Sequence, residues 1–381
     1  MYHLDRLATE LLLHIFRSCD SISDILNLAA TCKRIHRLLH TMPDKVQVLG
    51  DCAENEFGPI EDIVQLVTHN ESQAVHVVRT APVSMTLLGQ IVRIGRVARR
   101  WERIYPIKKW KVDYENRRSL TREEHFRLRR AVYRLWLYHR AFHVGYFDRF
   151  TRHHWSVIRR RAQLLHNWST DELAEIEDLR SVMCDVVQNH VCPSNGAIAR
   201  KFRKRYPNNN QLTFNIHLGY RYRNDVSHHS SSALPPPGLP AQDASTPNTV
   251  ERYFHTAHPT TNTTTMGSAS RDPAKYWSRF RNDFFHDPGN EGWGDEVLHY
   301  YVVQDMMKLD PCQILWLCDH APLKQQVEDY VYSIGGDAFR DNGETFFDTL
   351  IGVMKERGDE IADLKAAIDD QVLGIARTVD V

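Results

Sequence analysis

This chain of 381 residues lacks several features that would assign it to a well-defined class. No apolar run reaches the 18 or more residues of a membrane-spanning helix, so we expect no membrane partner. The charged N-terminal residues do not resemble a signal peptide, and we expect a protein of the cytoplasm, the nucleus or both. Seven cysteines without a Cys-x-x-Cys pair fit neither a disulfide framework nor a zinc finger.

Sequence motifs of enzymes and cofactor sites are missing as well. There is no Gly-x-x-x-x-Gly-Lys-Ser/Thr phosphate loop, no Gly-x-Gly-x-x-Gly after a strand and no Gly-x-Ser-x-Gly nucleophile turn. His139 and His143 have the i, i+4 spacing of zinc ligands, but no third ligand or catalytic glutamate accompanies them. We interpret them as surface or core imidazoles, and we expect no catalytic residue, no cofactor and no metal.

Most of the chain has the apolar periodicity of helices, which predicts a mainly α fold. The composition, 42% hydrophobic and 25% charged, is sufficient for a buried core. Ser84 is in position to cap one helix, and Thr121-Arg122-Glu123-Glu124 has the pattern of a capping box. Two segments, 45–50 and 74–79, resemble short strands instead.

Charge is unevenly distributed, although 48 basic and 48 acidic residues cancel. Residues 93–161 hold 21 Lys/Arg and 6 Asp/Glu, a local net charge of 21 − 6 = +15. Residues 283–381 hold 7 and 21, a net of 7 − 21 = −14. Such blocks can bind external partners or each other, and their near cancellation favours internal pairing.

A change of composition marks residues 225–272. This segment holds six of the sixteen prolines and fifteen Ser/Thr residues, with few side chains that could anchor it to a core. It is therefore predicted to be a disordered linker or loop.

The N-terminal segment is predicted to form three short helices with more apolar surface than they can bury among themselves. Leucines and isoleucine occupy the first helix all round, at positions 7, 11, 12, 13 and 15. A second helix is expected from Ser23, with Asp24 in its first turn, and a third from Thr31. At roughly 25 cal/mol per Å² of exposed apolar area, such a module is expected to have a permanent partner.

The same segment resembles an F-box. The consensus Leu-Pro-x-Glu-Leu-Leu-x-x-Ile-Phe aligns with residues 7–16, and Asp-Leu-Leu-x-Leu-x-x-x-Cys-Lys-Arg aligns with residues 24–34. Two positions depart from the family: Ala8 replaces the usual proline, and Ile35 replaces a common tryptophan. The resemblance covers about a tenth of the chain. The remainder loosely resembles F-box proteins of filamentous fungi, which indicates no substrate.

The resemblance implies a non-catalytic subunit of an SCF-type cullin–RING ubiquitin ligase. Such a subunit docks to a Skp-family adaptor, and through it to a cullin, while the rest of its chain recruits a protein substrate. Phe16, Ala29, Ile35 and Leu39 are then expected to hold the three helices together. The positions implied for adaptor contact are Leu7, Ala8, Leu11, Leu12, Ile15, Leu26, Leu28, Cys32 and Lys33.

These expectations divide the chain into four parts. Residues 1–45 are the F-box, 46–224 the first part of a helical substrate-recruiting region, 225–272 the linker or loop, and 273–381 an acidic helical region packed with 46–224.

The basic block supports an alternative function, a nucleic-acid-binding or scaffolding protein that uses its F-box outside a ligase. Its arginines at 127, 129, 130, 134 and 140 are interleaved with aromatic residues, a pattern found in nucleic-acid-binding proteins. The same block could also dock an acidic or phosphorylated substrate. Residues 200–205, Arg-Lys-Phe-Arg-Lys-Arg, fit a nuclear import signal and the charged end of a helix equally well.

Overall fold

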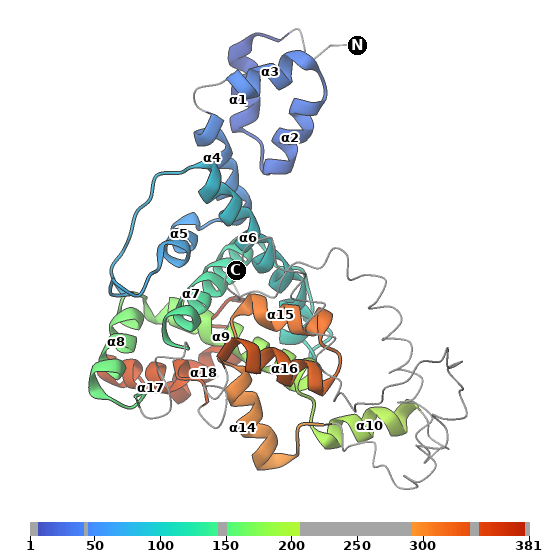
Figure 1. The fold of residues 1–381 in the computed structure, drawn as a ribbon, viewed down its shortest axis with the longest axis vertical. Coiled ribbons are helices and arrows are strands. Elements are labelled where there is room, and N and C mark those ends of the chain that lie inside the picture. Colours follow the sequence, from blue (N-terminus) through green and yellow to red (C-terminus); the bar gives the residue numbers. More distant parts are fainter. Residues whose placement is uncertain (1–6, 42–44, 144–150, 206–291, 336–342, 378–381) are drawn as a thin grey trace, which may run out of the picture. The chain divides into compact units, whose positions relative to one another are not determined.

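The structure, a computed structural model, describes residues 7–41, 45–143, 151–205, 292–335 and 343–377 (Figure 1). These ranges contain 15 α-helices, one π-helical turn and no β-strand, which confirms the prediction of a mainly α fold. The predicted strand at 45–50 is wrong, because these residues begin helix α4. Residues 74–79 form turns and irregular backbone. The predicted linker 225–272 lies outside the described residues.

The described residues fall into two compact units that are discontinuous in sequence. The first comprises 1–186, 307–311 and 344–381, and the second comprises 187–306 and 312–343. The C-terminal helices α17 and α18 therefore belong to the same unit as the N-terminal half of the chain. In the described ranges, no helix combines the length and apolarity needed to cross a bilayer.

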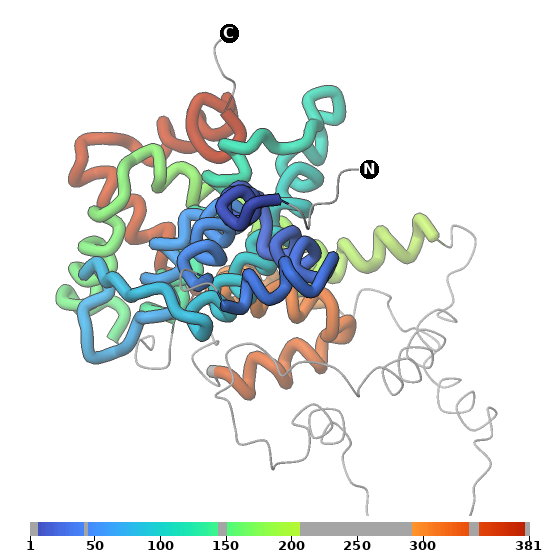
Figure 2. The backbone as a smooth tube through the Cα atoms, turned by 90° about the horizontal axis from the view of Figure 1, so that it is seen from above, coloured from blue at the N-terminus to red at the C-terminus, as the bar shows by residue number. Residues whose placement is uncertain are grey.

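The first unit is an assembly of eleven described helices. Its longest members, α6 and α7, pack against each other and against α9. Figure 2 shows α17 and α18 (red) beside α8 and α9 (green). The helices are α1 (Thr9–Arg17), α2 (Ile22–Ala30), α3 (Lys33–Thr41), α4 (Lys45–Phe57), α5 (Ile60–Thr68), α6 (Met85–Lys109), α7 (Arg122–Phe142), α8 (Trp155–His166), α9 (Thr170–Val186), α17 (Phe346–Arg357) and α18 (Ile361–Asp369).

Local sequence signals determine where the long helices begin. The Ser84 side chain accepts a hydrogen bond from the amide of Leu87, which caps α6 as predicted. Thr121 and Glu124 form both hydrogen bonds of a capping box at the start of α7, which confirms that prediction as well. Such caps satisfy amide groups that have no partner within the helix.

Helix α9 is buried on all sides, including its charged side chains. Glu175, Glu177 and Asp178 are each less than 5% exposed, and each has a cationic partner. Asp178 also accepts hydrogen bonds from the hydroxyl of Tyr105 and from the amide of Ile375. Because buried carboxylates require such partners, α9 fixes the positions of α6, α7 and the C-terminal residues.

In the part of the second unit that the structure describes there are five helical elements. Trp316 of α15 stacks on Tyr330 of α16, with ring centroids 4.8 Å apart. His299 of α14 hydrogen-bonds to the carbonyl of Cys192, close to the π-helical turn. The elements are η2 (Val187–Val191), α10 (Asn195–Arg205), α14 (Glu296–Met306), α15 (Pro311–His320) and α16 (Lys324–Gly335).

Candidate partner-binding surface

The three N-terminal helices share a small closed core. Figure 1 shows α1, α2 and α3 grouped near the start of α4, and each of them packs against α4. Phe16, Ala29, Ile35 and Leu39 are at most 3% exposed, as expected for the residues that join the helices. Ile25 is also fully buried. This core therefore closes while other large apolar side chains of the module stay exposed to solvent.

Most of the residues implied for adaptor contact remain accessible to solvent. Leu11 is 53% exposed and Leu26 is 55% exposed, whereas typical leucines are buried. Ala8 and Lys33 are exposed as well. Leu7, Ile15, Leu28 and Cys32 are partly buried. On α1, Leu11 and Ile15 are four residues apart and thus lie on one face of the helix.

Leu12 departs from the rest of the implied set. Its side chain is 0% exposed, because it lies four residues before Phe16 on the inward face of α1. It belongs to the core of the module, and we correct its assignment: Leu12 supports the surface from within and does not form part of it.

Two of the helices begin at residues other than those expected from the sequence. Ser21, rather than Ser23, caps α2, and its hydroxyl accepts a hydrogen bond from the amide of Asp24 at 3.0 Å. Helix α3 begins at Lys33, and the Cys32 sulfur accepts the amide of Ile35 at 3.5 Å. The short side chain of Cys32 thus takes part in the helix start as well as in the surface.

Helix α4 fastens the N-terminal module to the rest of the first unit. Its Cys52 thiol donates a hydrogen bond to the carbonyl of Cys19 at 3.0 Å. Burial raises the pKa of this thiol to about 12, with further contributions from Cys19 and Asp51. Cys52 therefore remains a neutral donor at physiological pH and is not activated as a nucleophile.

Glu56, near the end of α4, is the main polar link at this junction, and sequence reasoning did not identify it. Its carboxylate accepts the amide of Ile22 at 2.8 Å and pairs with Arg99 of α6 at 2.8 Å. Its backbone carbonyl accepts a hydrogen bond from Arg129 of α7. One residue, 6% exposed, thus connects α2 with α6 and α7. In a sequence, a glutamate within a helix ordinarily indicates a solvent-exposed position. The role of Glu56 in connecting these helices is therefore visible only in their packing.

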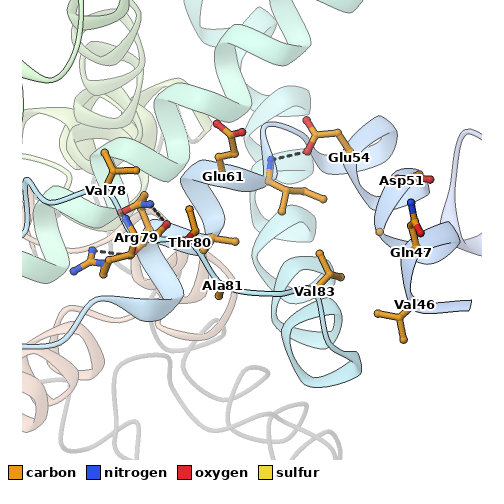
Figure 3. A pocket seen from close by; sticks show the side chains of 14 residues that line it. Val46, Gln47, Asp51, Glu54, Glu61, Val78, Arg79, Thr80, Ala81 and Val83 are labelled. Carbon is orange, nitrogen blue, oxygen red and sulfur yellow. Dashed lines mark hydrogen bonds between the residues drawn. The ribbon is translucent and has the colours of Figure 1, made fainter. Parts of the chain in front are cut away.

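A groove of about 750 Å³ lies beside this junction, between α4, α5 and residues 78–83 (Figure 3). Gln65 fixes one wall, because its side chain exchanges hydrogen bonds with the backbone amide and carbonyl of Arg79. The lining is largely apolar, with Val46, Ile60, Val64, Val78 and Val83. None of the fourteen lining residues is Ser, Cys or His. Its carboxylates are those of Asp51, Glu54 and Glu61, and Glu54 accepts a hydrogen bond from the amide of Ile60 at 3.0 Å.

The basic block is paired within the fold along α7. Arg130 contacts Glu172 and Glu175 of α9, and Arg134 contacts Asp62 of α5 and Glu172. Internal pairing was expected, but the partners of these arginines precede residue 187 and do not come from the acidic block 283–381. Arg152 does reach that block, at 3.8 Å from Asp348.

Three of the five aromatic residues of α7 face inward, whereas Phe126 is 36% exposed and Trp136 is partly buried. Tyr133, Tyr138 and Phe142 are at most 4% exposed, so they are not available for stacking on bases. His139 is also buried, and its Nδ1 hydrogen-bonds to the carbonyl of Leu309 at 2.7 Å. His143 lies next to it, with Nε2 3.2 Å from the Thr345 hydroxyl. His139 is thus a core residue, one of the alternatives expected from the sequence, and His143 is partly buried beside it.

Function can also be indicated by a group of metal-ligating side chains or by similarity to a known protein. Nowhere in the described part of the chain do three or more His, Cys, Asp or Glu side chains gather as metal ligands. The F-box resemblance rests on residues 7–34 themselves. No family model, no curated protein and no solved structure matches this chain.

Proposed function

We propose that this protein is the substrate-recruiting subunit of an SCF-type cullin–RING ubiquitin ligase. Its N-terminal helices dock to a Skp-family adaptor, which connects the chain to a cullin. The helical remainder presents a protein target for ubiquitination. Transfer of ubiquitin is the task of the conjugating partner, so the proposed role requires no catalytic residue in this chain.

One observation carries the proposal: Leu11 and Leu26 stay half exposed although the module that holds them has a closed core. Both residues occupy positions at which the F-box motif contacts its adaptor. Full burial of a leucine contributes about 1.5–3 kcal/mol, so burial of the exposed half of each would contribute about 1 kcal/mol. The two leucines together would then supply about 2 kcal/mol, or roughly a 30-fold gain in affinity.

The junction at α4 supports the same function. A recruiting subunit must hold its target in a defined position relative to the adaptor. Glu56 and Cys52 join α1 and α2 to α4 and α6 through hydrogen bonds and an ion pair. Buried polar links of this kind restrict relative motion, because breaking them leaves groups without a partner. The first unit is therefore suited to hold a bound target at a defined position relative to the adaptor.

Adaptor binding by the full chain tests the proposal. We expect a purified Skp-family adaptor to bind the native chain, and the double substitution Leu11→Asp, Leu26→Asp to weaken binding at least 30-fold. Aspartates at these positions would also place unpaired charge in an apolar contact. Isothermal titration calorimetry gives the dissociation constants, and unfolding curves establish that the variant is folded.

A matched control is provided by Val112→Asp, Val372→Asp. These valines are 88% and 63% exposed and lie outside residues 7–41. The control introduces the same charge and should bind the adaptor as the native chain does. Failure of the native chain to bind, or equal binding by the Leu11, Leu26 variant, would refute the proposed function.

A further inference from the structure

The groove between α4, α5 and residues 78–83 has two walls of different chemistry (Figure 3). The helical wall carries three carboxylates, Asp51 and Glu54 from α4 and Glu61 from the first turn of α5. The facing wall has no acidic residue and includes Val78 and Val83. We call the first the acidic wall and the second the apolar wall. A ligand that fills the groove has to match both.

The charge of the acidic wall is not neutralised within the described part of the chain. Asp51 and Glu61 are exposed and make no ion pair there. Glu54 is bonded to a backbone amide and not to a cation. Arg79, the one cation among the fourteen lining residues, donates a hydrogen bond to the carbonyl of Gln65 at 3.1 Å. Three carboxylates against one guanidinium give the groove a negative charge, which favours a cationic ligand.

The apolar wall remains open to solvent. Val78 is 75% exposed and Val83 is 41% exposed, and Val46, Ile60 and Val64 add apolar surface from the helices. Burial of apolar surface is the dominant favourable contribution to most protein association. A small cation would neutralise the carboxylates and leave this surface in water. The groove therefore favours a ligand that combines positive charge with apolar groups.

The backbone of the apolar wall is available for pairing. The amides and carbonyls of residues 80–83 make no hydrogen bond within the described chain. Pro82 favours extended backbone at Ala81, and Ser84 has extended dihedral angles, φ −131° and ψ 163°. Gln65 holds the preceding Arg79 through both its backbone amide and its backbone carbonyl. An extended peptide could thus pair with a segment that is fixed at its start.

We propose that this groove binds an extended peptide segment of another protein in which basic and apolar side chains alternate. Successive side chains of an extended peptide point to opposite sides, so the basic ones meet the acidic wall and the apolar ones meet the apolar wall. From Val46 to Glu54, α4 rises about 12 Å, which matches about four residues of extended peptide. Nucleic acids are disfavoured, because the carboxylates repel phosphate groups.

The inference deepens the proposed function, and it rests on that function in assigning the bound segment to a recruited target. No lining residue of the groove is among those implied for adaptor contact. Peptide binding is therefore measured with the full chain in the absence of an adaptor. Peptide binding by a chain that does not bind the adaptor would support the groove inference and refute the ligase function alone. Adaptor binding without peptide binding would overturn the groove inference alone.

The probe is a fluorescein-labelled peptide of eight residues in which lysine and leucine alternate, and fluorescence anisotropy gives its dissociation constant. One comparison peptide has glutamate in place of every lysine, and another has the same composition in two blocks, four lysines followed by four leucines. The alternating peptide should bind about tenfold or more tightly than the glutamate peptide and about threefold more tightly than the block peptide. Spermidine, which offers charge without apolar side chains, should displace the probe only at far higher concentration.

The decisive variant is Asp51→Lys, Glu61→Lys. It should weaken binding of the alternating peptide about tenfold or more, since two attractions become two repulsions, and it should strengthen binding of the glutamate peptide. Glu61 also lies in the first turn of α5, where the helix dipole favours an acidic residue. A milder variant, Asp51→Asn, Glu61→Gln, should weaken binding about threefold and replaces the first if circular dichroism shows a loss of helix.

The matched control is Asp359→Lys, Asp363→Lys. Both residues are exposed and lie outside the groove, and Asp363 is in the first turn of α18 as Glu61 is in that of α5. The control should bind the alternating peptide within about twofold of the native chain. The inference would be overturned by equal weakening in variant and control, by equal binding of the alternating peptide and either comparison peptide, by displacement at an equal concentration of spermidine, or by absence of binding to the native chain.

Discussion

Acid is expected to destabilise the first unit through His139. This imidazole is 3% exposed, and its ring hydrogen-bonds to the carbonyl of Leu309. Burial, opposed by that hydrogen bond and reinforced by Arg180, lowers the pKa of His139 from 6.5 to about 4. Burial likewise lowers the pKa of the neighbouring His143, with His139 as the next contribution.

The sign of the effect follows from the direction of the shift. A histidine whose pKa is lower in the folded state binds its proton more readily when unfolded. Its stabilising effect is therefore complete above pH 6.5 and is lost as the pH falls toward 4. At pH 5 the loss is about 1.5 pH units multiplied by about 1.36 kcal/mol, or about 2 kcal/mol for His139 alone.

A variant that cannot titrate isolates this contribution. Several buried carboxylates, Glu344 among them, have raised pKa values that act in the opposite direction, chiefly because of burial. They are present in both the native chain and His139→Gln, so they cancel in a comparison of the two. Urea unfolding at pH 7 and pH 5 gives the four free energies of unfolding that are needed.

The native chain should lose about 2 kcal/mol more than His139→Gln between pH 7 and pH 5. An equal loss in both chains would show that His139 does not titrate as a buried neutral group, and the placement of α7 against residues 307–311 would have to be revised. A larger loss in the variant would contradict the sign of the argument.

Two further predictions concern packing. Leu12→Ala should lower the free energy of unfolding by about 2–5 kcal/mol, because a fully buried leucine leaves a cavity, whereas Leu11→Ala should change it by less than about 0.5 kcal/mol. Urea unfolding at pH 7 compares the two, and equal losses would contradict the orientation of α1. Gly374→Ala should cost about 1–3 kcal/mol, since Gly374 has a φ of +94° and a Cβ atom there would lie 2.8 Å from Asp178 Oδ2. Gly89→Ala, on an open helix surface, should instead raise the free energy of unfolding by up to about 1 kcal/mol. If Gly374→Ala were as stable as the native chain, the left-handed backbone conformation at Gly374 would be refuted.

The candidate surface was only partly accessible to sequence reasoning. The motif positions correctly separated Phe16, Ile35 and Leu39 as core residues. Leu11 and Leu12 are adjacent and chemically identical, so composition and motif could not distinguish them. Their exposures, 53% and 0%, depend on which side of α1 faces α4. That orientation results from contacts between residues distant in sequence.

For the charge blocks too, one property could be predicted from the sequence and another depended on tertiary contacts. The sequence indicated correctly that the basic arginines of α7 would find internal partners. It could not indicate that these partners would be Asp62, Glu172 and Glu175, because ion pairs depend on which helices become neighbours.

The sequence alone determined the helical class, the caps at Ser84 and Thr121, and the apolar surplus of the N-terminal module. These properties arise from interactions within three or four residues, which a local pattern contains. Tertiary structure alone decided that residues 45–50 are helical, that Glu56 joins three helices, and that α9 is surrounded by partners for its carboxylates. Those outcomes depend on burial and on contacts between distant segments, which can override local preference.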